Sequence, residues 1–233
     1  MASSKSKDSA VTQKALTFQI RESYKVARTN IDYSIIKKGC KKIAFTSTAK
    51  SEGKTITAMN IALALAQQVE TKVLVIECDL RRPHVHSALD IAPTPGLANY
   101  LNEECAREDI IQQSKVQNLF AVCYGAIPPN PSELLASDAM HDFIKSVEKD
   151  YDYIIFDTTP VGVVIDAIPI IKASDGVVVV VRNNSTTYPQ LKITIDTLKR
   201  AGSKILGVIV NRVKPESRNK KKYYSGDYYY YGY

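Results

Sequence analysis

No apolar run in the 233-residue sequence approaches the roughly 20 residues needed to cross a bilayer. The first 14 residues are polar and contain no apolar core, so we predict no secretory signal. His84 and His86 have no third ligand nearby, and we interpret them as surface residues rather than a metal site. The cysteines lack C-x-x-C spacing, which favours reduced cytosolic thiols over a disulfide framework. They are Cys40, Cys78, Cys105 and Cys123.

The bulk composition is that of a soluble globular protein, with 45% hydrophobic and 24% charged residues. A chain of 233 residues suits one α/β domain with ordinary room for a core. The formal net charge of +7 suits an acidic partner, such as nucleic acid, anionic lipid or nucleotide. Much of this charge lies at the two ends of the chain, so it says little about the fold.

One stretch has the pattern of a phosphate-binding loop. The apolar run Ile43 to Phe45 leads into a turn of small residues and then into Gly53-Lys54-Thr55. An apolar stripe with helical spacing follows, which predicts a strand, a tight loop and a helix in that order. Backbone N–H groups of such a loop point at phosphates, and the helix dipole favours their negative charge. Thr48 stands where the usual pattern begins with glycine.

Each residue of Gly53-Lys54-Thr55 has a chemical role in binding nucleotide. Gly53 allows the backbone to approach the nucleotide, Lys54 would reach the β- and γ-phosphates, and the Thr55 hydroxyl would hold Mg²⁺. ATP and Mg²⁺ are therefore the predicted ligands. The residues assigned to nucleotide contact in this loop are Ser51, Glu52, Gly53, Lys54, Thr55 and Ile56.

The rest of the chain alternates between apolar strands and amphipathic helices. Helices are predicted over 20–35, 138–149 and 191–200, and strands over 72–79, 119–122, 153–157, 175–182 and 204–213. Residues 84–115 look like short helices and loops, and Ser132 is a plausible cap for a helix near Glu133. Continuous apolar strands alternating with helices predict a parallel β-sheet covered by helices on both faces.

Carboxylates stand at the ends of two predicted strands. Ligands of such sheets bind beyond the carboxyl ends of the strands, where the loop, Glu77, Asp79 and Asp157 all fall. Asp157 is well placed to hold Mg²⁺ through water, and Asp79 could be a second metal carboxylate or the base. Lys54, Glu77, Asp79 and Asp157 are therefore the candidate catalytic residues, with Thr55, Asp79 and Asp157 at the metal. Arg81 could neutralise phosphate charge.

We divide the chain into three parts. Residues 1–17 are predicted to be a mobile arm, residues 18–214 the nucleotide-binding domain, and residues 215–233 a disordered low-complexity tail. Half of the 14 tyrosines lie in the tail. They are Tyr223, Tyr224, Tyr228, Tyr229, Tyr230, Tyr231 and Tyr233.

Nearly the whole chain resembles the bacterial tyrosine kinases of capsule and exopolysaccharide synthesis. Residues 47–55 resemble the Walker A loop of that family, residues 73–79 with Arg81 its Walker A′ motif, and residues 154–160 its Walker B motif. Residues 22–28 are similar to its E-x-x-R-x-x-R subunit-contact motif, and the terminal tyrosines to its autophosphorylated cluster. The fold implied is the P-loop fold of partitioning-type ATPases.

The resemblance also implies an activity and partners. It implies an ATP-dependent protein-tyrosine kinase that phosphorylates its own tail, in trans, and regulates polysaccharide synthesis. Glu22, Lys25 and Arg28 would form the contacts of a ring, with an octamer suggested, and Asn211 and Arg212 would contact adenine. The implied partners are a membrane activator, which would recruit the cytoplasmic chain to the inner face of the plasma membrane, and a phosphotyrosine phosphatase. No nucleic acid is expected.

Five positions depart from the family pattern. Lys50-Ser51 replaces Pro-Gly, Glu77 replaces the first Asp of the A′ motif, Thr159 replaces a Pro, and Lys25 replaces the middle Arg of the contact motif. Glu77 moves its charge by about one methylene beside the expected metal, which predicts reduced activity or a changed metal preference.

Two other functions fit parts of the pattern. A partitioning or septum-positioning ATPase would use the basic charge to bind DNA or membrane, but its loop has a lysine at the place of Ala49, and it has no reason for a tyrosine tail. A non-enzymatic scaffold that binds nucleotide as a switch would share the loop. Tyrosine phosphorylation of the purified chain with Mg-ATP separates the kinase from both.

Overall fold

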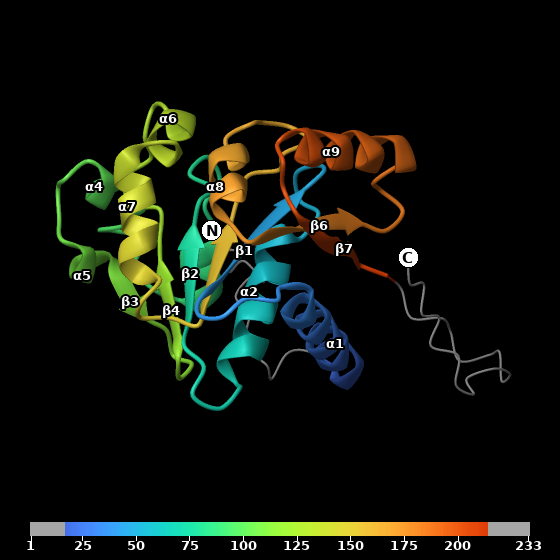
Figure 1. Ribbon diagram of the computed structural model, residues 1–233, viewed down its shortest axis with the longest axis horizontal. Helices are drawn as coiled ribbons and strands as arrows, with labels where there is room; N and C mark the ends of the chain where they lie inside the picture. The colour runs from blue at the N-terminus through green and yellow to red at the C-terminus, as the bar shows by residue number, and fades with distance from the viewer. Residues whose placement is uncertain (1–16, 214–233) are drawn as a thin grey trace, which may run out of the picture.

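The computed structural model describes residues 17–213 of the chain. Within them the strands form one sheet of seven in the order β3-β4-β2-β5-β1-β6-β7, and only β3 and β4 are antiparallel (Figure 1). The strands are β1 (Lys41–Ser47), β2 (Val73–Glu77), β3 (Ile111–Gln113), β4 (Leu119–Val122), β5 (Tyr153–Asp157), β6 (Gly176–Arg182) and β7 (Ile205–Asn211). The helices are α1 (Phe18–Ser34), α2 (Lys54–Ala66), α3 (Val85–Leu89), α4 (Leu97–Leu101), α5 (Arg107–Ile110), α6 (Pro131–Leu135), α7 (Asp138–Val147), α8 (Ala167–Ala173) and α9 (Tyr188–Arg200).

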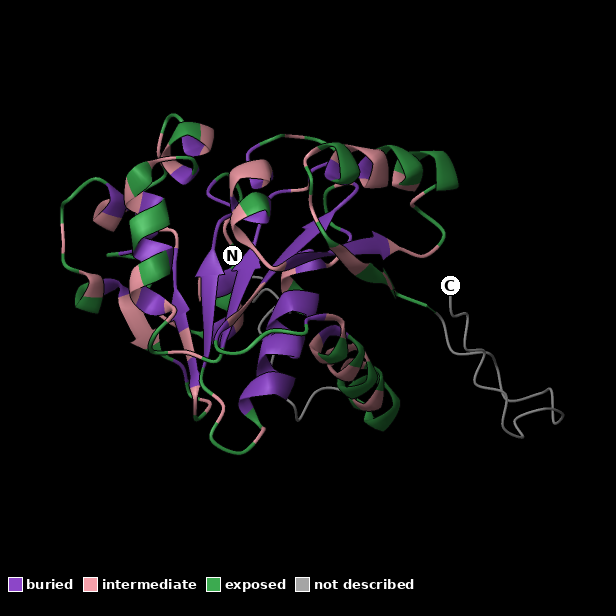
Figure 2. Cartoon of the chain, viewed as in Figure 1, coloured by how far each residue is buried: buried purple, intermediate pink, exposed green. Residues whose placement is uncertain are grey.

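Alternate residues of the central strands belong to two hydrophobic clusters. Ile43 and Phe45 of β1 pack in one cluster with residues of α1 and α2. Ala44, between them, packs in the other cluster with residues of α7, α8 and α9. Because successive side chains of a strand point to opposite faces, this alternation places helices on both faces of the sheet. The central strands are buried along most of their length, as Figure 2 shows in purple, which confirms the predicted fold class.

The last strand is less well covered than its apolar sequence predicts. β7 lies at the edge of the sheet, and the exposed fractions of Val208 and Val210 are 40% and 52%. An edge strand has a neighbouring strand on one side only, and here the helices cover it only in part. The expectation of cover on both faces therefore holds for the centre of the sheet and not for β7.

Helix α1 forms as its apolar spacing predicts, with the Thr17 side chain accepting a hydrogen bond from the backbone N–H of Ile20. Only the second half of its stripe is buried: Ile31 and Ile35 are covered, whereas Ile20 is 43% exposed. The first turns of α1 therefore present apolar surface.

Three features differ from the sequence-based expectations. Ser132 is not a helix cap, because α6 begins one residue earlier at Pro131 with Asn130 as the N-cap; proline suits the first position of a helix, where its missing N–H costs nothing. Strand β3, within the stretch expected to hold only short helices and loops, pairs with β4, and α8 was not predicted. Both elements are short, so their sequence periodicity is weak.

The parallel arrangement brings the loops that follow several strands to the same side of the sheet, at the carboxyl ends of the strands. The strands that precede the phosphate-binding loop and the acidic positions, β1, β2 and β5, lie next to one another with their carboxyl ends on the same side. No helix within residues 17–213 has the length and apolarity to cross a membrane.

Candidate active site

The turn between β1 and α2 forms the floor of the site. Gly53, the N-cap of α2, has a φ of 93°, a left-handed conformation that glycine adopts without strain. A Cβ at this position would lie 2.0 Å from Nδ2 of Asn211. Both the backbone angle and the close approach of Asn211 therefore require glycine here.

Ser51 has a φ of 61°, also in the left-handed region. The Pro-Gly of the resembled motif supplies a glycine at this position, which adopts such an angle freely. A serine with its Cβ costs about 1–2 kcal/mol in the same conformation. The Lys50-Ser51 departure thus keeps the shape of the loop at a cost in backbone strain.

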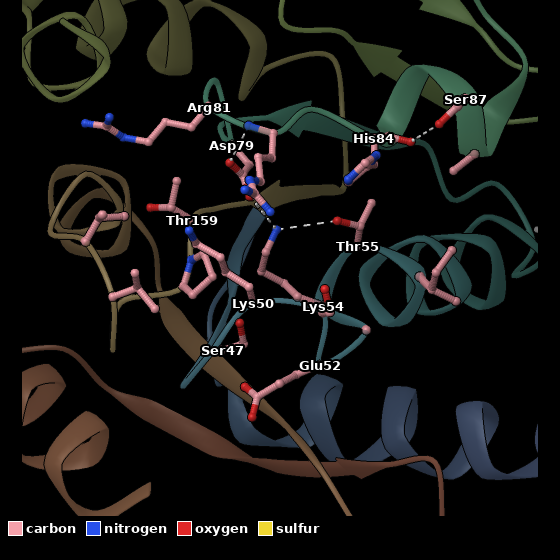
Figure 3. A pocket seen from close by; sticks show the side chains of 18 of the residues that line it. Ser47, Lys50, Glu52, Lys54, Thr55, Asp79, Arg81, His84, Ser87 and Thr159 are labelled. Atoms are coloured by element: carbon pink, nitrogen blue, oxygen red, sulfur yellow. Dashed lines mark hydrogen bonds and ion pairs between the residues drawn. The ribbon is translucent and has the colours of Figure 1, made fainter. Parts of the chain in front are cut away.

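Glu52 connects this loop to the segment before α9 through hydrogen bonds. Its carboxylate, 2% exposed, accepts a hydrogen bond from the backbone N–H of Ala49 at 2.8 Å and another from the Thr186 hydroxyl in the loop before α9. Asn211 Nδ2 donates to the Glu52 carbonyl at 2.9 Å. Figure 3 shows the Glu52 side chain pointing away from Lys54. Its carboxylate is therefore occupied by the protein, so a contact of Glu52 with nucleotide would come from its backbone.

The Lys54 ammonium lies between two acidic side chains that the fold brings together. Its Nζ is 2.5 Å from Oδ1 of Asp157 and 3.6 Å from Oδ2 of Asp79. The Thr55 hydroxyl donates to Oδ2 of Asp157 at 2.7 Å. Lys54 and Asp79 point toward each other in Figure 3, and both are nearly buried. Burial raises the pKa of the Asp79 carboxyl above its usual range, against the opposing effect of Lys54.

The donor set of this cluster fits a magnesium ion bound together with nucleotide. The Thr55 hydroxyl and the carboxylates of Asp79 and Asp157 supply only oxygen, which Mg²⁺ prefers. The part of the chain that the structure describes contains no group of three or more His, Cys, Asp or Glu residues able to hold a metal. One or two carboxylates are nevertheless what a magnesium ion uses when phosphates and waters complete its coordination.

An ion pair between Arg81 and Asp166 lies at another wall of the site. Arg81 Nη2 donates to Oδ1 of Asp166 at 3.3 Å, and its Nε donates to Oδ2 of the same carboxylate. Asp166 is 3% exposed and precedes α8, whereas Arg81 lines the cavity and points away from Lys54 in Figure 3. The sequence analysis did not find Asp166; an acidic residue directly before a short helix was the only available signal. The Asp79 carboxylate also accepts a hydrogen bond from the backbone N–H of Arg82 at 3.1 Å.

Glu77 serves a different structural purpose from its neighbour Asp79. It is fully buried, and its carboxylate accepts hydrogen bonds from the backbone N–H groups of His84, of Val85 at 2.6 Å and of Tyr124 at 3.2 Å. Burial raises the pKa of Glu77 to about 7, more than these hydrogen bonds lower it. Glu77 is not among the residues that line the cavity, so its side chain organises the loop between β2 and α3.

The cavity above the loop has a volume of about 510 Å³. All six loop residues predicted to contact nucleotide, 51–56, line it, together with Asp79 and Arg81. Asp157 is fully buried beneath Lys54 rather than in the wall. His84 is exposed, as expected of a surface histidine, and it also lines the cavity.

The two residues predicted to contact adenine differ in whether they line the cavity. Arg212 lines the cavity, whereas Asn211 lies against the loop through Glu52 and Gly53. The adenine role of Asn211 stays a prediction, because the structure gives it a loop contact instead.

The predicted subunit contacts lie on α1. Lys25 Nζ pairs with Oε1 of Glu22 at 2.7 Å, both partly exposed. Arg28 Nη1 donates to the Ala64 carbonyl of α2 at 3.1 Å within the same chain. The seven tail tyrosines and the predicted arm up to residue 16 lie outside the described residues.

Comparison with known proteins gives one family. Residues 40–207 match the family model described as an AAA domain. Tyrosine-protein kinase YwqD of Bacillus subtilis is 37% identical over 203 residues, covering 87% of this chain and 85% of that protein. Tyrosine-protein kinase CpsD of Streptococcus agalactiae is 36% identical over 212 residues, covering 91% and 89%.

Solved structures agree in fold. The chimerical protein CapA2B2 superposes with a TM-score of 0.81 at 30% identity, covering 88% of each chain. The kinase domain of Escherichia coli tyrosine kinase ETK follows with a TM-score of 0.79 at 28% identity, covering 89% and 80%. The cell division ATPase MinD of Pyrococcus furiosus is less similar, with a TM-score of 0.62 at 26% identity, covering 74% and 72%. The partitioning or positioning ATPase is therefore the less favoured interpretation.

The loop geometry predicts the effect of Gly53→Ala. The new Cβ meets Asn211 Nδ2 and the φ of 93° becomes strained, so we expect ATP affinity, measured by calorimetry, to fall at least about tenfold. Gly53→Ala/Asn211→Ala removes the contact but not the strain, and should recover only part of the loss.

The single variant Asn211→Ala is the control, and it also tests the adenine prediction. If Asn211 only braces the loop, ATP and GTP affinities fall by the same factor. A selective loss of ATP affinity indicates adenine contact. Wild-type ATP affinity in Gly53→Ala would contradict our account of the loop.

Proposed function

The chain belongs to the bacterial tyrosine kinase family, and we propose that its cavity transfers the γ-phosphoryl group of ATP to tyrosines of the chain's own tail. The observation that carries this proposal is the Lys54 cluster, in which one ammonium, one hydroxyl and two carboxylates meet at the start of α2. Phosphoryl transfer needs this combination: a cation for the phosphates, oxygen ligands for a divalent metal, and a carboxylate near the attacking hydroxyl.

Each residue has one role in the proposed reaction. The N–H groups at the start of α2 and the Lys54 ammonium bind the phosphates of ATP. Thr55 and Asp157 would hold Mg²⁺, which neutralises phosphate charge when bound. The tyrosyl oxygen forms a bond to the γ-phosphorus as the bond from that phosphorus to the β–γ bridging oxygen breaks, and the hydroxyl proton passes to Asp79. The raised pKa of Asp79 suits it to accept this proton.

Two further residues support this centre. Arg81 lines the cavity and can turn from Asp166 to the transferred group, whose negative charge it would stabilise. Glu77, assigned to the catalytic set from the sequence, acts in this proposal by holding the loop that carries Asp79 and Arg81, through its backbone contacts to His84 and Tyr124.

The position of the tail's origin supports its role as substrate. The last described residue is Val213, and Arg212, directly before it, lines the cavity. The tail therefore begins close in sequence to a residue of the cavity wall. The 20 residues from Lys214 can extend at most about 70 Å, at about 3.5 Å per residue. That length reaches a neighbouring cavity as well as the chain's own. Each phosphate adds about −1.5 to −2 charges at neutral pH, so several would repel the carboxylates of the site and release the tail.

We propose that α1 forms the contact between subunits of a ring. A head-to-tail contact repeated around an axis closes into a ring. Besides the Glu22–Lys25 pair, the first turns of α1 expose apolar side chains, with Phe18 68% and Val26 58% exposed. Transfer between subunits would then occur within an octamer.

The biological setting is proposed from the resemblance. The kinase would regulate capsular or extracellular polysaccharide synthesis, with a membrane activator that recruits it to the plasma membrane and a phosphotyrosine phosphatase that reverses the reaction. Stimulation of tail phosphorylation by the cytoplasmic segment of such an activator would support this arrangement, and no stimulation would count against it.

We expect Lys54→Met to reduce autophosphorylation with Mg-ATP at least about 100-fold, because the transferred group loses its principal cation. Asp79→Asn should do likewise while leaving the Lys54–Asp157 pair in place, so folding is less at risk. Lys192→Met, on the exposed face of α9, is the matched control. Near wild-type phosphotyrosine in both site variants would reject the kinase mechanism, and a chain that binds ATP without labelling would be a nucleotide switch.

A mixing experiment tests transfer between subunits. An inactive Lys54→Met chain that carries the tail is incubated with an active chain whose seven tail tyrosines are Phe. Label on the inactive chain, detected by mass spectrometry, is the expected result. If no label appears there while the wild type is labelled normally, transfer occurs within one chain.

Replacing Glu22, Lys25 and Arg28 together by Ala is expected to convert the ring to monomers, measured by light scattering with the activator segment present. Arg28 also contacts Ala64 within the chain, so the double variant Glu22→Ala/Lys25→Ala separates assembly from stability. A wild type that remains monomeric while its tail stays unphosphorylated contradicts the ring.

A further inference from the structure

A second hollow lies near the amino end of the central strand β1, at the opposite end of that strand from the nucleotide cavity. Its walls are the loop between α1 and β1 and the last turns of α7. Strand β1 begins directly after this loop, at Lys41, and ends at Ser47, which lines the nucleotide cavity. Seven residues of strand span about 23 Å, so the hollow and the cavity face opposite ways.

Lysines dominate this hollow. Four lysines line it against two carboxylates, those of Asp142 and Glu148. Glu148 is already paired with Lys42, and Lys37 pairs with Asp175 at 2.9 Å. Within residues 17–213 the remaining three form no ion pair, and all three are exposed. They are Lys38, Lys145 and Lys149.

Helix dipoles account for only part of this arrangement. A lysine in the last turn of a helix, such as Lys145 of α7, interacts favourably with the carbonyl end of that helix. Lys37 and Lys38 follow α1 in the loop before β1, and Lys149 lies beyond the last residue of α7. The cluster therefore collects cations from two separate segments at one place.

Exposed apolar side chains adjoin the lysines in sequence. Ile36, directly before Lys37, is 98% exposed, and Tyr33 in the last turn of α1 is 79% exposed. Single exposed apolar residues are ordinary. An aliphatic and an aromatic side chain close in sequence to lysines of the hollow are instead the combination that enters the headgroup region of an anionic bilayer.

We propose that this basic hollow, with Ile36 and Tyr33, docks the chain directly onto an anionic lipid surface. The lysines would contact lipid phosphates, and the two apolar side chains would enter the interface. Docked by this hollow, the chain would keep its nucleotide cavity turned away from the bilayer and open to solution. The inference does not depend on which group the cavity phosphorylates.

The test uses the full chain and vesicles of phosphatidylcholine with or without phosphatidylglycerol, with binding measured by co-sedimentation. We expect binding only to the anionic vesicles, weakening as salt is raised. Since each lysine near such a surface contributes about fivefold in affinity, Lys38→Glu/Lys145→Glu/Lys149→Glu should bind at least about 100-fold more weakly. Ile36→Ser should weaken binding without changing its salt dependence.

The matched control is Lys220→Glu/Lys221→Glu/Lys222→Glu, which changes the net charge by the same amount in the tail. This variant should keep affinity within about tenfold of the wild type. Both triple variants should keep wild-type ATP affinity, which shows that they fold.

Three outcomes would overturn the proposal. One is a hollow variant that binds vesicles as the wild type does, and another is a tail variant that loses as much affinity as the hollow variant. The third is a wild type that ignores phosphatidylglycerol but binds polyglutamate in a way that requires the three lysines, which would assign the hollow to an acidic protein segment instead.

Discussion

The structure depends most on the burial of the Lys54 ammonium between Asp157 and Asp79. Charges withdrawn from water are costly unless each finds a partner of opposite sign and further hydrogen bonds. The Thr55 hydroxyl and the backbone N–H of Arg82 supply those bonds to the two carboxylates. Two carboxylates beside one ammonium leave an excess of negative charge, which a bound magnesium ion would compensate.

That cluster is held in place by a loop whose own conformation is fixed by contacts from distant segments. Glu52 links the loop to Thr186, and Asn211 bonds the Glu52 carbonyl while packing against Gly53. Thr186, which follows β6, and Asn211, the last residue of β7, thus hold the loop that leads into Lys54, although neither carries a charge of the Lys54 cluster. This bracing accounts for a loop that retains its shape with Ser51 at a left-handed φ.

The two ends of the parallel strands differ in chemical character. At the carboxyl ends of the strands, the phosphate-binding loop and Asp79 line the nucleotide cavity. At the amino ends, helix C-termini and the α1–β1 loop collect unpaired lysines. Parallel strands favour this division, because a helix that connects two of them begins near the carboxyl end of one strand and ends near the amino end of the next.

The sequence by itself determined the elements and the local chemistry. Apolar periodicity located the parallel strands and the long helices, and the spacing of Gly53, Lys54 and Thr55 identified a phosphate-binding loop, because both signals arise within a few consecutive residues. Strand β3 and helix α8 were not predicted, because β3 has only three residues and the seven residues of α8 include a proline, which is unfavourable within a helix.

Only the tertiary structure decided which side chains meet. Glu77 and Asp79 are two residues apart, yet the first binds backbone N–H groups of His84 and Tyr124 while the second faces Lys54. The pairing of Arg81 with Asp166 joins positions 85 residues apart. Side-chain direction beyond the end of a strand depends on loops packed from elsewhere in the chain, and local sequence carries no record of those contacts.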